Sequence, residues 1–183
     1  MPDLSLFSSP APYHIITYGT LLGTEFFQSF VSGIVAFKAL TRPQFSQLQQ
    51  KIFPIYFSIQ TALPVVLALT YPGSRNPLGP SSSISGTLAE SNRWSVLAPL
   101  ATMFVGGLVN LVYVGPATTN IMRERKIQES KDGKKSYDPA PHSKEMQQLN
   151  KAFGKMHGVS SLVNLGALIA TIWYGFSLAE RIH

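Results

Sequence analysis

Hydrophobic residues are concentrated in four long runs along the chain, and polar segments separate these runs. The first run contains only Glu25 and Lys38 as charged residues, and the other three contain none. About 20 such residues in an α-helix, at a rise of about 1.5 Å each, cross the hydrocarbon core of a bilayer. The pattern predicts an all-α integral membrane protein, a four-helix transmembrane bundle, with a single domain over 14–183 that follows a flexible N-terminal segment, 1–13. The predicted spans are residues 14–40, 53–71, 94–116 and 159–179.

The composition supports this prediction and excludes several other classes of protein. Only 13% of the residues are charged, whereas ordinary soluble domains have about 25%. The mean hydropathy of +0.12 is modest because it averages apolar spans with polar loops. The chain contains no cysteine, which excludes a disulfide-stabilised scaffold, a thiol enzyme and a cysteine-ligated metal centre.

Positively charged residues are distributed unequally between the two sides of the predicted bundle. Twelve of the 15 Lys and Arg residues lie in or beside the first and third loops, and three lie on the other side. The positive-inside rule therefore places the third loop, 117–157, in the cytosol and both termini in the lumen or outside the cell. Basic and acidic residues are interleaved in this loop, so we expect no nucleic-acid partner. The expected partners are the lipid bilayer and, at this loop, anionic lipid headgroups.

Helical signals continue into the cytosolic loop. A helix is expected to resume after Pro116 and to reach about Ser130, and Ser143 is a suitable N-cap for an amphipathic helix that leads into the fourth span. The sequence therefore predicts cytosolic helical extensions between helices 3 and 4. Whether the second extension contacts a partner, lipid or the protein's own cytosolic face stays open. In the third span, Gly106 and Gly107 predict close helix packing.

Polar side chains inside the spans are the candidates for function, because a polar group in lipid is costly unless it is paired. Many recur at spacings of three, four and seven residues, on one face of a helix. The candidate binding residues are Glu25, Gln28, Ser32, Gln60, Asn110, His157, Ser160, Ser161 and Asn164. Counting about 1.5 Å per residue places four of them about 9–12 Å from the cytosolic helix ends, namely Ser32, Gln60, Asn110 and Asn164.

Two interpretations of this polar layer are open. It can consist of interhelical hydrogen bonds, which contribute on average about 0.6 kcal/mol each in membranes, or it can line a hydrophilic pocket open to the cytosol. Glu25 lies deeper, about 20 Å from the cytosolic end, where no Lys or Arg is available. Its carboxyl group is therefore protonated, exposed to a wet cavity or hydrogen-bonded to polar neighbours. It is the best candidate for a proton-linked or cation-linked role.

The sequence lacks the catalytic and nucleotide-binding motifs that are common in soluble enzymes. The four His residues form no HExxH pair, and no GxSxG elbow, P-loop or GxGxxG motif precedes a predicted helix. We therefore expect no catalytic residues, no metal site and no cofactor, and we expect that the protein is not an enzyme.

Several segments together resemble the family of transmembrane protein 205, also called the DUF4149 family. The segments run from Phe30 to Leu40, from Arg42 to Phe57, from Gly115 to Met122 and from Phe153 to Leu165. The resemblance implies a four-span protein of the endomembrane system or plasma membrane. An animal member is associated with platinum-drug resistance and vesicular export, with sulfur-containing side chains proposed as metal contacts, and this chain lacks cysteine. The motif residues carried over as structural are Gly33, Pro54, Pro116, Thr118, Thr119 and Gly158.

Two functions follow as expectations. The first is a non-enzymatic scaffold or accessory subunit that acts through other membrane proteins or as a homo-oligomer. The alternative is a small transporter or exporter, metal-linked or proton-linked, with a polar pocket between the helices. A wet cavity that reaches Glu25 would favour transport, and a dry, closed bundle would favour the scaffold.

Overall fold

Four helical segments form the protein, and each is long and apolar enough to cross a membrane. The computed structural model describes residue 7, residues 9–73 and residues 82–182. Within these residues the only regular secondary structure is helical, which confirms the all-α prediction. The segments are Pro10–Ala39, Arg42–Leu69, Glu90–Asp132 and Lys144–Glu180.

Turns of other helix types divide these segments into shorter elements. The first segment comprises α1 (Pro10–Phe27), η2 (Gln28–Ser32) and α2 (Gly33–Ala39), and the second is α3 (Arg42–Leu69). The short α4 (Ser83–Thr87) and η3 (Glu90–Asn92) lead to η4 (Arg93–Leu97), α5 (Ala98–Val109), η5 (Asn110–Val114) and α6 (Gly115–Asp132). The last helix is α7 (Lys144–Ile182).

The first two helices begin earlier than the hydrophobic pattern predicts. Helix α1 begins at Pro10, inside the segment predicted to be flexible, because the side chain of Ser9 caps it and accepts a hydrogen bond from the Ala11 N–H. Residues 1–6 and 8 of that segment lie outside the described residues. Helix α3 begins at Arg42, where Thr41 provides the N-cap, and not near residue 53. Capping and a polar first turn extend a helix without adding hydrophobic residues, so the apolar run underestimates its length.

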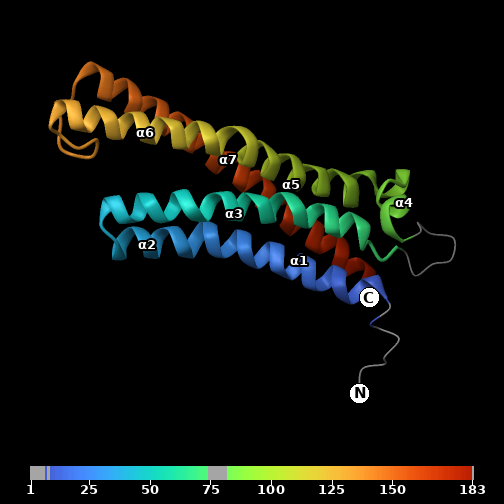
Figure 1. The fold of residues 1–183 in the computed structure, drawn as a ribbon. Helices are drawn as coiled ribbons and strands as arrows, with labels where there is room; N and C mark the ends of the chain where they lie inside the picture. The colour runs from blue at the N-terminus through green and yellow to red at the C-terminus, as the bar shows by residue number, and fades with distance from the viewer. Residues whose placement is uncertain (1–6, 8, 74–81, 183) are drawn as a thin grey trace.

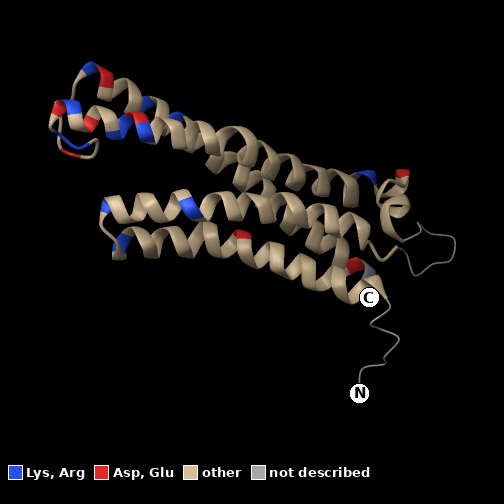
Figure 2. Ribbon diagram, viewed as in Figure 1, with Lys and Arg blue, Asp and Glu red and all other residues tan. Residues whose placement is uncertain are grey.

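The four helices pack in a closed order, with α3 against α1 and α5, and α7 against α1, α5 and α6 (Figure 1). The start of α1 and the end of α7 lie at one end of the bundle, here called the terminal end. The connections at residues 40–41 and 133–143 lie at the opposite end, here called the charged end. Figure 2 shows that most Lys and Arg residues gather there. This distribution matches the one from which the sequence predicts a cytosolic location.

The second pair of helices is longer than the first. Glu90–Asp132 has 43 residues and α7 has 39, which correspond to about 65 and 58 Å. A hydrocarbon core is only about 30 Å thick, so α6 and the first turns of α7 extend beyond it and form the predicted helical extensions. The predicted N-cap of α7 is confirmed, because the Met146 N–H donates to Ser143 Oγ at 3.1 Å.

The terminal end contains the main hydrophobic core. Its buried members are Leu21, Leu67, Tyr71, Val96, Leu100, Met103 and Tyr174. The buried His14 connects three helices there, because its Nε2 lies 2.8 Å from the Tyr174 hydroxyl and its Nδ1 lies 3.1 Å from Thr70 Oγ1. The Thr70 hydroxyl donates to the Val66 carbonyl, so Nδ1 is the donor toward Thr70 and Nε2 accepts from Tyr174.

Close helix packing at Gly107 confirms one expectation from the small residues. A Cβ atom added there would lie 2.9 Å from the backbone carbon of Gln60 and from the backbone nitrogen of Thr61 on α3. The neighbouring Gly106 faces Val163 and Ala167 on α7 at ordinary contact distances. The glycine pair therefore lets α5 pack closely between α3 and α7.

Two of the π-helical turns have a local cause. The turns η4 and η5 directly precede the helices that carry Pro99 and Pro116 in their first two positions. A proline ring crowds the carbonyl four residues earlier, and these carbonyls, of Ser95 and Val112, lie within the π turns. The extra residue in each turn accommodates the proline without breaking the helix.

The predicted orientation is directly testable because the chain has no cysteine of its own. Lys131→Cys at the charged end is expected to react with a membrane-impermeant maleimide added from the cytosolic side. Ser91→Cys near the terminal end is exposed and is expected to react only after the membrane is permeabilised. Labelling of intact and permeabilised membrane preparations measures both, and the reverse pattern would overturn the orientation.

Candidate functional site

A cavity of about 1130 Å³ lies between α2 and α3 on one side and α6 and α7 on the other, in the half of the bundle toward the charged end. On the side of the terminal end, the turn η5 contributes Leu111 to the cavity lining. The candidate binding residues that line it are Gln28, His157, Ser160, Ser161 and Asn164. The motif residues that line it are Gly33, Pro54, Pro116, Thr118 and Thr119.

Two further candidates pair with each other in the buried layer beyond the cavity. Gln60 Nε2 donates a hydrogen bond to Glu25 Oε1 at 2.8 Å, and both side chains are almost completely buried. Counting from Phe53 placed Gln60 too close to the charged end, because α3 begins at Arg42, 11 residues or about 16 Å earlier. Gln60 therefore lies at the depth of Glu25.

The Glu25–Gln60 pair is short of hydrogen-bond donors. Glu25 Oε2 and Gln60 Oε1 are both buried without a hydrogen-bond partner in the structure. The nearby Thr171 hydroxyl donates to the Ala167 carbonyl of its own helix. No Lys or Arg among the described residues forms an ion pair with Glu25. A proton on the carboxyl group would supply the donor that these acceptors lack.

Tyr56 connects the buried pair to the cavity. Gln60 Nε2 also lies 3.4 Å from the Tyr56 hydroxyl. Ser29 and Tyr56 both line the large cavity. A continuous series of polar side chains thus leads from the cavity through Tyr56 and Gln60 to Glu25.

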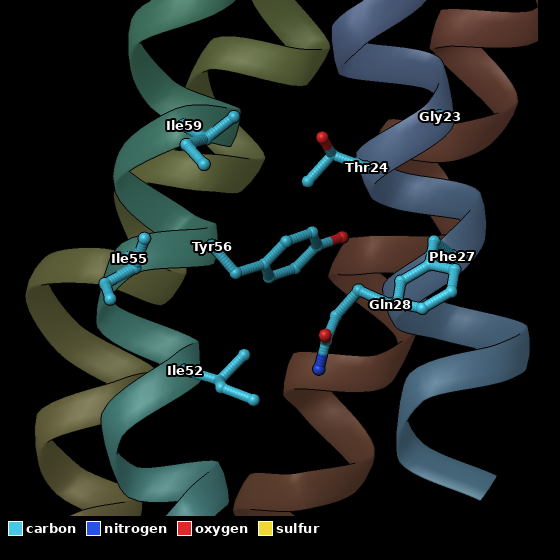
Figure 3. A pocket seen from close by; sticks show the side chains of 8 residues that line it. All are labelled: Gly23, Thr24, Phe27, Gln28, Ile52, Ile55, Tyr56 and Ile59. Atoms are coloured by element: carbon cyan, nitrogen blue, oxygen red, sulfur yellow. The ribbon is translucent and has the colours of Figure 1, made fainter. Parts of the chain in front are cut away.

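A second, smaller cavity lies between α1 and α3 (Figure 3). Its volume is about 370 Å³, and it is lined mainly by Ile52, Ile55, Ile59 and Phe27. Figure 3 shows the Tyr56 ring extending from α3 toward α1, with its hydroxyl at the far end. Tyr56 and Gln28 line both cavities.

The third and fourth membrane helices share another polar contact. Asn110 Nδ2 donates to Asn164 Oδ1 at 3.1 Å, so these two candidates lie at one level, as the depth count predicts. Asn110 is fully buried in η5, while Asn164 lines the cavity. The pair therefore joins η5 to α7 at the inner end of the cavity.

The remaining candidates do not join these networks. Ser32 lies in η2 and does not line the cavity, and Gly158 has open space where a Cβ would be. Ser161 donates to the His157 carbonyl in its own helix. The His157 ring stacks on Phe153, with ring centroids 6.0 Å apart. Among the residues described here, no group of three or more His, Cys, Asp or Glu side chains could hold a metal ion.

Several residues that form buried hydrogen bonds have no distinctive pattern in the sequence. His14, Tyr56 and Tyr174 lie in apolar or aromatic runs, where an aromatic residue is ordinary core material. Ser29 is different, because it lies four residues after Glu25, on the polar face that the helical spacing predicts. Arg125 reaches the cavity from α6, a helix that sequence reasoning treated only as an extension.

A family model described as a domain of unknown function, DUF4149, matches residues 16–127. The chain belongs to the DUF4149 family. Xanthocillin biosynthesis cluster protein D from Aspergillus fumigatus is 35% identical over 179 residues, which cover 98% of this chain and 95% of the relative. No solved structure matches this DUF4149 chain.

The four segments that carry the family resemblance meet at the large cavity of this DUF4149 protein. Lining residues come from each segment, for example Phe37, Phe53, Thr118 and Ser161. Residues of the terminal core, such as Tyr174, belong to none of these segments. The family model itself, over residues 16–127, also includes Leu21, Leu67 and Met103 of the terminal core.

Cysteine labelling tests whether water reaches the cavity. Ser161 lines the cavity, whereas the neighbouring Leu162 does not and is 71% exposed on the outer surface of the bundle. Ser161→Cys is therefore expected to react with a water-soluble maleimide in the membrane-embedded protein, and Leu162→Cys is expected to react much more slowly because lipid covers it. Equal, slow reaction of both would indicate a dry cavity.

Proposed function

We propose that this DUF4149 protein is a small membrane transporter or exporter that carries an amphipathic molecule in the cavity between its helix pairs. The observation that carries the proposal is the cavity of about 1130 Å³ between the two helix pairs, with polar side chains in its lining. The scaffold function requires no internal cavity, so it leaves this arrangement without a reason.

The lining suits a cargo with both apolar and polar parts. Aromatic residues such as Phe37, Phe53 and Phe57 provide apolar walls, and Ser160, Ser161 and Asn164 provide hydrogen-bonding groups. The volume of about 1130 Å³ exceeds the range of about 300–1,000 Å³ that is typical of small-molecule sites. The cavity therefore has room for a molecule with a long apolar portion.

Glu25 gives the proposal a proton-linked form. The cavity does not itself reach Glu25. The carboxyl group lies at the end of the polar series through Tyr56 and Gln60, where gain or loss of one proton changes the hydrogen-bond balance of the cluster. Intramembrane carboxyl groups of this kind mark proton relays in other transporters. In this proposal, gain or loss of a proton at Glu25 is coupled to the conformation of the cavity.

The relatives support a small-molecule cargo. The curated relative is named for a xanthocillin biosynthesis cluster, and transport is one of the tasks that the production of a small molecule requires. The resemblance to the family of transmembrane protein 205, an animal member of which is associated with vesicular export, also supports a transported cargo. At 20.0 kDa the chain is small for alternating access, so the proposal includes a homo-oligomer or a membrane partner, in the endomembrane system or plasma membrane.

A bulky substitution inside the cavity separates transport from scaffolding. In cells that lack the native gene, Ser161→Trp would occupy the cavity, while Leu162→Trp would place the same side chain on the outer surface. We expect wild type and Leu162→Trp, but not Ser161→Trp, to restore the normal ratio of extracellular to intracellular amphipathic metabolites, measured by mass spectrometry. Full restoration by a stably folded Ser161→Trp protein would favour the scaffold instead.

A further inference from the structure

The mouth of the large cavity carries an excess of positive charge. Five basic residues line it, and Glu129 is the acidic residue among the lining side chains. The basic residues are Lys38, Arg42, Arg123, Arg125 and Lys126. They come from the last turn of α2, the first turn of α3 and the middle of α6, so they surround the mouth from both helix pairs.

Glu129 neutralises little of this charge. Its carboxylate lies 3.4 Å from Lys126 Nζ and 4.0 Å from Lys135 Nζ, and its Oε1 accepts hydrogen bonds from the Ser136 N–H and hydroxyl. The remaining four basic side chains at the mouth form no ion pair with the residues that the structure describes. An unneutralised cluster of this kind at a partly enclosed site attracts an anion.

Two of the guanidinium groups are already oriented by aromatic side chains. The Arg42 guanidinium carbon lies 3.9 Å from the centre of the Phe37 ring, and that of Arg125 lies 4.5 Å from the centre of the Phe153 ring. Arg125 Nε is buried without a hydrogen-bond partner. A guanidinium that stacks on a ring keeps its N–H edge available, and this edge matches the oxygens of a phosphate.

The cavity changes character with depth. The basic residues lie at or beyond the ends of the apolar spans, at the level where a bilayer has its headgroups. Further in, the walls include Phe30, Ile34, Phe57 and Leu165, which belong to the apolar spans. The site thus combines an anion-binding entrance with an apolar interior.

We propose that the cavity binds an anionic phospholipid, with its phosphate between Arg42 and Arg125 and an acyl chain along the aromatic interior. Basic sites between transmembrane helices on the cytosolic side bind anionic lipid headgroups in other membrane proteins. A free inorganic anion would use the entrance alone and would leave the apolar interior without a role. This inference rests on the proposed function in one respect, because it names the class of cargo for the same cavity.

Lipid binding to the purified full chain tests the inference. Dioleoyl phosphatidic acid or dioleoyl phosphatidylcholine is added to protein in mild detergent, and bound lipid is counted by native mass spectrometry. We expect wild type to prefer phosphatidic acid and the double variant Arg42→Gln/Arg125→Gln to bind it at least about tenfold more weakly, because two charge-assisted contacts are lost. The matched control Lys144→Gln/Lys151→Gln removes the same charge from exposed positions outside the cavity and is expected to bind as wild type does.

Each other outcome overturns the inference. Equal binding of the two lipids would exclude recognition of the anionic headgroup, and an equal loss in the control would show a non-specific charge effect. Displacement of the lipid by the same concentration of inorganic phosphate would show that only an anion is bound.

If the first double variant does not fold, Lys38→Gln/Arg123→Gln, at two exposed positions of the mouth, is expected to show the same weakening. Because the assay needs no transport, binding without export would leave this inference standing and would contradict only the transport proposal.

Discussion

Replacing Glu25 with alanine is expected to lower the free energy of unfolding by about 2–4 kcal/mol, because the change both empties a buried site and removes a hydrogen-bond acceptor. The Gln60 amide, which donates to Glu25 at 2.8 Å, would then be buried without this partner. Thermal unfolding of the detergent-solubilised protein, followed by near-ultraviolet circular dichroism, measures the loss.

Glu25→Gln is the informative partner of this variant. A neutral amide can accept from Gln60 Nε2 and can also donate to Gln60 Oε1, which has no partner in the structure. We therefore expect Glu25→Gln to stay within about 1 kcal/mol of wild type, while it loses the proton-linked step of transport. Glu124→Ala, at an exposed position, is the control and should change stability by less than about 0.5 kcal/mol. A loss in Glu25→Gln as large as in Glu25→Ala would mean that the ionised carboxylate stabilises the fold.

Gly107→Ala is expected to destabilise the protein by about 1–3 kcal/mol, because the added methyl group has no space. It would lie 2.9 Å from backbone atoms of Gln60 and Thr61, which cannot move away as a flexible side chain can. The clash displaces the part of α3 that carries Gln60, so the variant is also expected to weaken the contact with Glu25. Thermal unfolding in detergent measures the loss of stability.

Gly166→Ala is the matched control for this substitution. It makes the same chemical change in a long membrane helix, at a site where a Cβ meets no atom within 4 Å. Alanine favours a helix over glycine by up to about 1 kcal/mol, so the control is expected to be neutral or stabilising. If neither variant destabilised the protein, α5 and α3 would be farther apart than the structure indicates, and equal destabilisation of both would show a general effect of replacing glycine.

The spans could be predicted from the sequence because the bilayer requires a continuous apolar stretch of known length. The helix starts at Pro10 and Arg42 could not be predicted from the hydrophobic pattern, because capping by Ser9 and Thr41 extends a helix without hydrophobic residues. The error at Arg42 then propagated to the depth assigned to Gln60. Depth counts are only as accurate as the helix end from which they are counted.

The candidate site could be predicted in part. Periodicity placed Ser160, Ser161 and Asn164 on one face of their helix, and that face lines the cavity. Periodicity gives no rotation of one helix relative to another, so it could not assign Gln60 to Glu25 or separate Ser32 from the rest. The basic entrance could not be predicted for another reason, because the charge of the third loop was attributed to orientation and to anionic lipid headgroups at the membrane surface, and not to a cavity. That explanation does not distinguish Arg125, which faces the cavity, from Lys131, which does not line it.

The contact of His14 with Thr70 and Tyr174 joins α1, α3 and α7 at the terminal end, and this determines how the cavity can change size. Relative rotation of the helix pairs about a fixed end moves each residue in proportion to its distance from that end. Arg42 lies 28 residues from Thr70, or about 42 Å along α3, so each degree of rotation shifts it by about 0.7 Å. Small rotations of the helix pairs about the contact of His14 would therefore widen or narrow the entrance by at least the size of a methyl group. The terminal core would stay packed during this movement.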